Sequence, residues 1–195
     1  MSRSKEKAKR PSHKTVLQIL TGSIAAYKSP DLIKGMRADG MRVVCVMTAA
    51  AHEFVTPTVL RTVSGERVYS EMFPKDAPFG ILHTSLAELP DLVLVAPATA
   101  NFIAKLAAGI SDDLAGCICL ATRKPIVIVP AMNDGMYFHP ITQKNIAQLK
   151  ALGYHFLDPI EGELACGKVG VGHITTDASI RAAIRGILHK KIRRS

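Results

Sequence analysis

Short apolar runs alternate along the chain with stretches of helical periodicity. The runs over 15–20, 42–47, 91–95 and 125–129 predict strands, and a weaker run over 154–157 predicts a further one. Apart from Asp91, those over 91–95 and 125–129 are continuously apolar, which is typical of parallel strands buried on both faces. The alternation of strands and helices predicts an α/β fold, a parallel sheet with helices on both faces.

The remaining segments are assigned from capping and turn residues. A helix is expected after the Gly22-Ser23 turn, with Pro30 in its first turn and Asp39-Gly40 at its end. Helical structure is also predicted over 49–64, 99–121, 140–152 and from Thr176. The stretch 99–121 should break at Gly109 and begin again with a cap at Ser111. A short strand is predicted at 67–69 and a loop over 74–82.

The net charge of +9 is concentrated at the two ends of the chain. Residues 1–14 contain six Lys/Arg and one Glu, and residues 181–195 contain six Lys/Arg and no acid, so the body carries a slight negative charge. We therefore expect a basic disordered tail over 1–13, a single folded domain over 14–189 and a basic C-terminal tail over 190–195. Basic tails can contact nucleic acid or anionic lipid, but solvated ends are the simpler interpretation, and nucleic-acid binding is not expected.

Several classes of protein do not fit this sequence. No apolar run approaches the roughly 20 residues that span a membrane, and the polar N-terminus does not resemble a secretory signal. Four irregularly spaced cysteines indicate a reducing compartment, which we expect to be the cytoplasm. Cys117 and Cys119 have no matching second pair or His cluster, so no metal site is expected.

The most informative stretch is 130–137, Pro-Ala-Met-Asn-Asp-Gly-Met-Tyr, which follows a predicted strand. It should lie at the carboxyl end of that strand, the edge where open α/β sheets bind ligands. The Asn133 amide both donates and accepts hydrogen bonds, so it could hold a carboxylate or carbonyl in one orientation. The alternative is an ordinary strand-to-helix turn in which Met132 and Met136 fill space.

Two other turns fall at the same predicted edge. Gly22-Ser23 follows the first strand and opens a helix, where backbone amides and a hydroxyl can bind an anion. It lacks the G-x-G-x-x-G spacing, so a mononucleotide phosphate fits better than a dinucleotide. Thr99 and Asn101 follow a later strand within a small-residue stretch, and could form a second wall of a cofactor site or an ordinary helix N-cap.

Two side chains could carry chemistry. His83 interrupts an apolar segment and could act as an acid, a base or a carboxylate anchor, or be a structural histidine with its hydrogen bonds satisfied. Cys166 lies among four glycines over 162–172, beside Lys168. The glycines predict a mobile flap, and a thiol there is more plausibly reactive than a buried apolar cysteine would be.

Taken together, these stretches resemble the homo-oligomeric flavin-containing cysteine decarboxylases. The match runs from about Lys14 to about Ala183 and rests on the Asn133 loop and the Ala165-Cys166-Gly167 flap. Within the family the chain is most similar to members that decarboxylate 4′-phosphopantothenoylcysteine to 4′-phosphopantetheine in coenzyme A biosynthesis. The resemblance implies a three-layer Rossmann-like fold with a parallel six-stranded sheet, bound FMN, and a homotrimer or a dodecamer of trimers with sites at subunit interfaces.

The resemblance also implies a role for each residue. FMN would oxidise the substrate cysteine to a thioaldehyde, CO₂ would leave to give an enethiol, and reduced FMN would return hydride while Cys166 supplies the proton. His83 and Cys166 are the implied catalytic residues, and Asn133 would bind the substrate carboxylate, aided by Met132, Ala165 and Gly167. The implied FMN-binding residues are Gly22, Ser23, Ile24, Thr48, Ala98, Thr99, Ala100, Asn101 and Ala131.

The sequence departs from the family pattern at several positions. Tyr137 replaces a common Trp, His173 a common Arg, and 49–51 lacks hydroxyls that some members place near the FMN phosphate. No ligase domain follows, so a stand-alone decarboxylase is expected. Three alternatives remain: a peptidyl-cysteine decarboxylase that releases the enethiol, a flavin prenyltransferase, which is not expected to combine this loop and flap, and a decarboxylase-like regulatory binding subunit.

Overall fold

The computed structural model describes residues 13–74, 81–163, 167 and 169–192. A six-stranded parallel sheet forms its centre, in the order β3-β2-β1-β4-β5-β6. The strands are β1 (Thr15–Leu20), β2 (Arg42–Met47), β3 (Val68–Tyr69), β4 (Leu92–Ala98), β5 (Ile126–Pro130) and β6 (His155–Phe156). The predicted Rossmann-like parallel sheet is confirmed.

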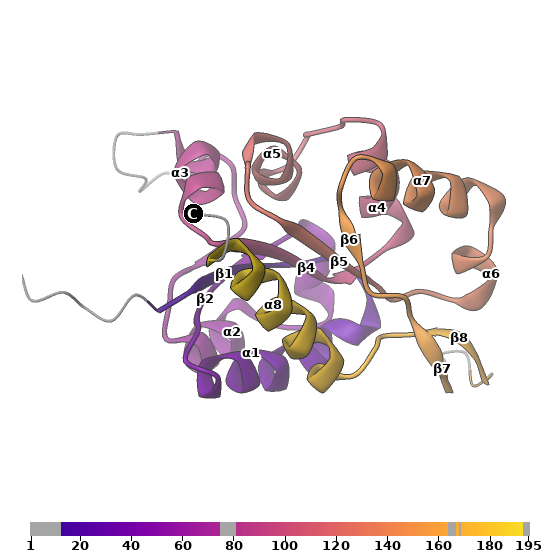
Figure 1. Ribbon diagram of the computed structural model, residues 1–195, viewed down its shortest axis with the longest axis horizontal. Coiled ribbons are helices and arrows are strands. Elements are labelled where there is room, and N and C mark those ends of the chain that lie inside the picture. Colours follow the sequence, from indigo (N-terminus) through magenta and orange to yellow (C-terminus); the bar gives the residue numbers. More distant parts are fainter. Residues whose placement is uncertain (1–12, 75–80, 164–166, 168, 193–195) are drawn as a thin grey trace, which may run out of the picture.

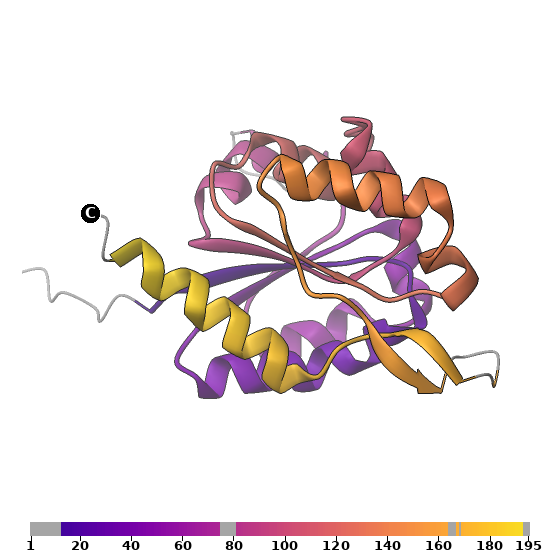
Figure 2. The ribbon, with the colours of Figure 1, turned by 45° about the vertical axis from the view of Figure 1, so that its right-hand side comes forward.

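Helices cover both faces of the sheet, as Figures 1 and 2 show. One face carries α1 (Ser29–Ala38), α2 (Pro57–Ser64) and α8 (Asp177–Ile192), and the other carries α3 (Leu82–Glu88), α4 (Ala100–Ala107), α5 (Leu114–Ala121) and α7 (Pro140–Ala151). Short 3₁₀ helices η1 (Ile24–Lys28) and η2 (Ala49–Glu53) follow β1 and β2, and α6 (Asp134–Tyr137) follows β5. None of the helices in the described ranges is both long and apolar enough to cross a membrane.

The core consists of two apolar layers, one on each side of the sheet. Alternate residues of a strand point to opposite layers, so Val16 packs with the α1 and α8 side chains while Leu17 packs with those of α4 and α5. This arrangement explains the continuously apolar strands β4 and β5, because every position of both is buried. β1 is also buried throughout, and it includes the polar residue Gln18, whose amide donates to Ala96 O at 2.9 Å.

Three segments differ from the sequence-based expectations. Helix α3 begins at Leu82, so His83 lies in a helix rather than in a polar interruption before a strand. Helix α5 is capped by Asp113, whose carboxylate accepts from Gly116 N at 2.7 Å, and not by Ser111. The Gly-rich segment, expected to be a flap, forms the antiparallel hairpin β7 (Ile160–Glu163) and β8 (Val169–His173).

Candidate functional site

The carboxyl ends of β1, β4 and β5 are joined by side-chain hydrogen bonds. The Thr21 hydroxyl donates to Pro97 O at 2.8 Å and accepts from Thr99 N at 3.0 Å, which links β1 to β4. The Ser23 hydroxyl donates to Ala131 O at 3.0 Å, which links β1 to β5. Chain crossovers run in opposite directions from β1 and β4, so this edge is the topological switch point at which such sheets bind ligands.

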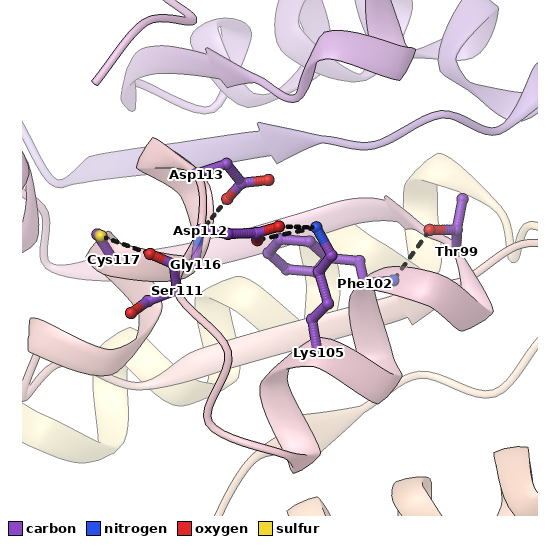
Figure 3. Close-up of polar contacts among 8 residues, drawn as sticks. All are labelled: Thr99, Phe102, Lys105, Ser111, Asp112, Asp113, Gly116 and Cys117. Atoms are coloured by element: carbon purple, nitrogen blue, oxygen red, sulfur yellow. Dashed lines mark hydrogen bonds and ion pairs between the residues drawn. The ribbon is translucent and has the colours of Figure 1, made fainter. Parts of the chain in front are cut away.

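Thr99 begins α4, and Figure 3 shows its hydroxyl accepting from Phe102 N at 3.2 Å. The N-cap interpretation of this residue is therefore confirmed, although its hydroxyl proton can still be donated to a ligand. Ala98 is buried, Ala100 is half-buried and Asn101 is exposed. Figure 3 also shows the contact between Lys105 of α4 and Asp112, which are 2.8 Å apart and form an ion pair.

The loop after β5 is shaped by the side chain of Asn133. Its Oδ1 accepts from Gly135 N at 2.9 Å and caps α6, so the plane of the amide is fixed by the chain itself. Tyr137 closes the turn: its ring is buried and its hydroxyl donates to Asp158 at 3.3 Å. Burial and the Asp158 carboxylate both raise the Tyr137 pKa, so the phenol stays protonated at neutral pH.

A cavity of about 640 Å³ opens beside this loop. Four segments line it, namely the turn after β1 with η1, the loop after β5, the β7–β8 hairpin and the residue that follows β8. The lining residues are Ser23, Ile24, Ala25, Tyr27, Lys28, Ala131, Met132, Asn133, Glu163, Gly167, Gly172, His173 and Ile174. The cavity size is within the range of small-molecule sites.

The hairpin is held against the Asn133 loop by a close backbone contact. Met132 N donates to Gly172 O at 3.1 Å. A Cβ atom on Gly172 would lie 2.1 Å from Met132 O, so only glycine permits this approach. The hairpin therefore forms one wall of the cavity rather than a separate lobe.

The cavity includes six of the predicted site residues: Ser23, Ile24, Ala131, Met132, Asn133 and Gly167. Gly22, Thr48, Ala98, Thr99, Ala100 and Asn101 lie at or just beyond the same carboxyl edge of the sheet but do not line this cavity. Ala165 and Cys166 lie outside the described residues. A second cavity of about 560 Å³, at the ends of β2 and β3, contains none of the predicted residues.

His83 is far from the cavity within one chain. Figures 1 and 2 place α3, where His83 is half-buried, and the β7–β8 hairpin at opposite ends of the molecule. A single copy of the chain therefore does not bring His83 to Asn133.

Besides Glu163, sequence reasoning missed a second charged residue that lines the cavity, Lys28. Its Nζ lies 2.6 Å from Nε2 of His173 across the cavity wall, and 5.9 Å from the centre of the Tyr27 ring. Lys28 is the only charged residue between Thr21 and the end of η1. A single lysine in the otherwise uncharged segment that follows the first strand was the sequence feature that could have identified it.

The described cysteines provide no reactive thiol at this edge. Burial raises the Cys45 pKa to about 12 and also raises the pKa of Cys119, so both remain protonated. The Cys117 thiol donates to Ser111 O at 3.3 Å on α5 (Figure 3). Among residues that the structure describes, no three His, Cys, Asp or Glu side chains are grouped as metal ligands.

Known proteins match this chain over most of its length. The coenzyme A biosynthesis bifunctional protein CoaBC of Haemophilus influenzae is 40% identical over 172 residues, 88% of this chain and 43% of the relative. This chain thus spans less than half the length of that relative.

Solved structures share the fold. A PPC decarboxylase mutant complexed with pantothenoylaminoethenethiol superposes with a TM-score of 0.79 at 28% identity, covering 89% of this chain and 97% of that one. The FMN-dependent cysteine decarboxylase SpaF superposes with a TM-score of 0.80 at 30% identity, covering 91% and 96%. A family model described as Flavoprotein matches residues 3–189, and on that match the chain belongs to the Flavoprotein family.

Proposed function

We propose that the chain is an FMN-dependent decarboxylase that converts 4′-phosphopantothenoylcysteine to 4′-phosphopantetheine. The observation that supports this most directly is that Asn133 and Lys28 both line one cavity. An oriented amide and an ammonium group match a substrate with a carboxylate at one end and a phosphate at the other. The likeness to CoaBC and to the PPC decarboxylase supports the same substrate.

The residues at the switch point fit FMN. Ser23 and Ala131 line the cavity with small side chains, which leaves room for a bound group beside the backbone. Gly22 is small because a Cβ atom there would lie 2.5 Å from Ala50 Cβ, and Ala98 is fully buried. Ser23, Thr48 and Thr99 add hydroxyls, and the Thr48 hydroxyl makes no capping bond to η2. When bound, FMN supplies the reversible two-electron oxidation of the substrate cysteine, which makes the overall reaction redox-neutral.

The side chains around the cavity would orient the substrate. The amide of Asn133, fixed by its cap on α6, would direct the carboxylate so that the bond to CO₂ faces the cofactor. Met132 is half-buried beside it and offers an apolar surface that excludes water. Cys166 remains the predicted proton donor to the enethiol carbon, and His83 the predicted second catalytic group.

A site completed by a second copy of the chain accounts for the position of His83. Two large apolar side chains of the cavity wall are exposed, with Ile24 51% and Tyr27 59% accessible, and Phe138 after α6 and Ile141 in α7 are 58% and 64% accessible. Surfaces of this kind typically mark contacts between protein chains. We therefore propose a homo-oligomer, a trimer or a dodecamer of trimers, in which α3 of one copy reaches the cavity of another.

The reaction would take place in the cytoplasm, because Cys45, Cys117 and Cys119 are free thiols. A peptide cysteine is the second candidate substrate, supported by the likeness to the cysteine decarboxylase SpaF. A C-terminal peptide cysteine offers the carboxylate for Asn133 but no phosphate for Lys28. The cation in the cavity wall therefore favours the phosphorylated substrate.

The test is to incubate the FMN-loaded protein with 4′-phosphopantothenoylcysteine and measure the product mass. We expect the loss of CO₂ alone, which means that the enethiol has been reduced. A product that also lacks two hydrogens would indicate release of the enethiol, as expected of a peptidyl-cysteine decarboxylase. No product from loaded protein, with turnover of a peptide ending in cysteine, would reject the coenzyme A assignment.

A further inference from the structure

The imidazole of His173 lies between two hydrogen-bonding partners. Its Nδ1 is 3.3 Å from Glu163 O, and its Nε2 is 2.6 Å from the Lys28 ammonium. A carbonyl oxygen only accepts and an ammonium only donates. The arrangement that satisfies both contacts is the neutral ring with the proton on Nδ1, so that Nε2 accepts from Lys28.

Glycines in the hairpin give this ring its position. A Cβ atom on Gly162 would lie 3.0 Å from Cγ of His173, so the ring occupies space that a side chain on β7 would fill. The neighbouring Gly172 holds β8 against Met132 by the backbone contact described above. The His173 acceptor is therefore attached to the same wall that carries Asn133.

We propose that His173 is a positioning residue for Lys28, and that it sets the preference of the cavity for phosphorylated over unphosphorylated ligands. This inference rests on the proposed function. A lysine ammonium ends a flexible four-carbon chain and loses conformational freedom when it binds an anion. Accepting one of its three N–H bonds restrains Lys28 beforehand, in a wall that also carries the Glu163 carboxylate and lies within electrostatic range of Asp177.

The identity of residue 173 decides which kind of contact Lys28 makes. An Arg at position 173 would place a second permanent cation beside Lys28, whereas a neutral histidine offers an acceptor. The two arrangements bind a phosphate differently, one with two cations and the other with a single oriented cation.

The experiment is calorimetric titration of FMN-loaded protein with 4′-phosphopantetheine and with pantetheine. For His173→Leu we expect binding of 4′-phosphopantetheine to weaken about three- to tenfold, the value of one hydrogen bond, and pantetheine binding to stay unchanged. His173→Gln should restore most of the affinity, because its amide can accept from Lys28 and donate to Glu163 O. The matched control is His155→Leu on β6, an exposed histidine outside the cavity.

A double-mutant cycle tests whether His173 acts through Lys28. In a Lys28→Met background, His173→Leu should cause no further loss of 4′-phosphopantetheine affinity. Additive losses, equal losses for both ligands, or a Gln variant as weak as the Leu variant would overturn the inference.

Binding measurements on the wild-type protein distinguish a failure of this inference from a failure of the proposed function. Equal binding of both ligands would overturn the phosphate preference and leave the decarboxylation of cysteine conjugates intact. Failure to bind either ligand or to turn over 4′-phosphopantothenoylcysteine would overturn the proposed function, and this inference with it.

Discussion

Asn133 combines a structural and a chemical role in one side chain. Its Oδ1 caps α6 through Gly135 N, and the same bond fixes the direction of the amide at the cavity. A substitution can therefore separate the roles only if it preserves the cap. Aspartate does so, because its carboxylate is also a good N-cap acceptor.

We expect Asn133→Asp to fold normally and to lose at least about a hundredfold in kcat/KM, because a carboxylate would repel the substrate carboxylate and cannot donate to it. Thermal unfolding and steady-state kinetics measure the two effects. Asn133→Ser is the neutral control that also keeps a cap acceptor, and it should lose activity less severely. Normal turnover by the Asp variant would reject the role assigned to this loop.

At the scale of elements, the position of the β7–β8 hairpin depends on backbone contact more than on side-chain packing. Its two strands are mostly exposed or half-buried, with only Gly172 buried. Glycine is depleted in strands, so composition predicted a flap. The hairpin forms because its backbone pairs internally and with the Met132 amide, a contact that no local pattern encodes.

Gly172→Ala should displace the hairpin, because the new Cβ would meet Met132 O at 2.1 Å. We expect a loss of about 1–3 kcal/mol in stability together with weakened ligand binding. Gly186→Ala, in α8 with no atom near its Cβ, is the matched control and should stabilise the protein by about 0.5–1 kcal/mol. Denaturant unfolding measures both values, and an unaffected Gly172 variant would contradict the close packing of the hairpin.

Helix α3 was also missed, for a related reason. It is seven residues long and buries only Leu86 and Ala87, packed in the same layer as α5. A helix this short is marginal in isolation, and its stability comes from packing. In contrast, α1 and α7 carry Pro at the first turn and α4 carries a Thr N-cap, so their starts were readable from the sequence.

At the scale of the whole molecule, the predicted catalytic residue His83 and the predicted substrate-binding residue Asn133 lie at two ends. Figure 1 shows α3, which contains His83, and the β7–β8 hairpin, near α6, at opposite ends of the molecule. Asn133 is the N-cap of α6 and lines the cavity together with the hairpin. If both serve one reaction, each site must use two copies of the chain. The exposed apolar residues around the cavity are consistent with such a contact.

Mixing inactive His83→Ala and Asn133→Ala subunits should therefore restore activity, because some interfaces would pair an intact His83 with an intact Asn133. The measurement is the decarboxylase activity of refolded mixtures. Native mass spectrometry checks that mixed oligomers have formed. Each variant refolded alone is the control. Mixed oligomers that remain inactive would indicate that the site lies within one chain.

The sequence by itself determined the sheet, its burial and the sheet edge at which the predicted site residues gather. The periodicity of apolar residues, the prolines and the cap residues act over a few neighbouring positions, so they can be recognised locally. It also identified Asn133, Ser23 and Thr99 as residues of that edge. Only the tertiary structure brought Lys28 to His173, 145 positions apart, and placed the hairpin against Met132. Such contacts depend on how the whole chain closes on itself, and a local pattern carries no information about them.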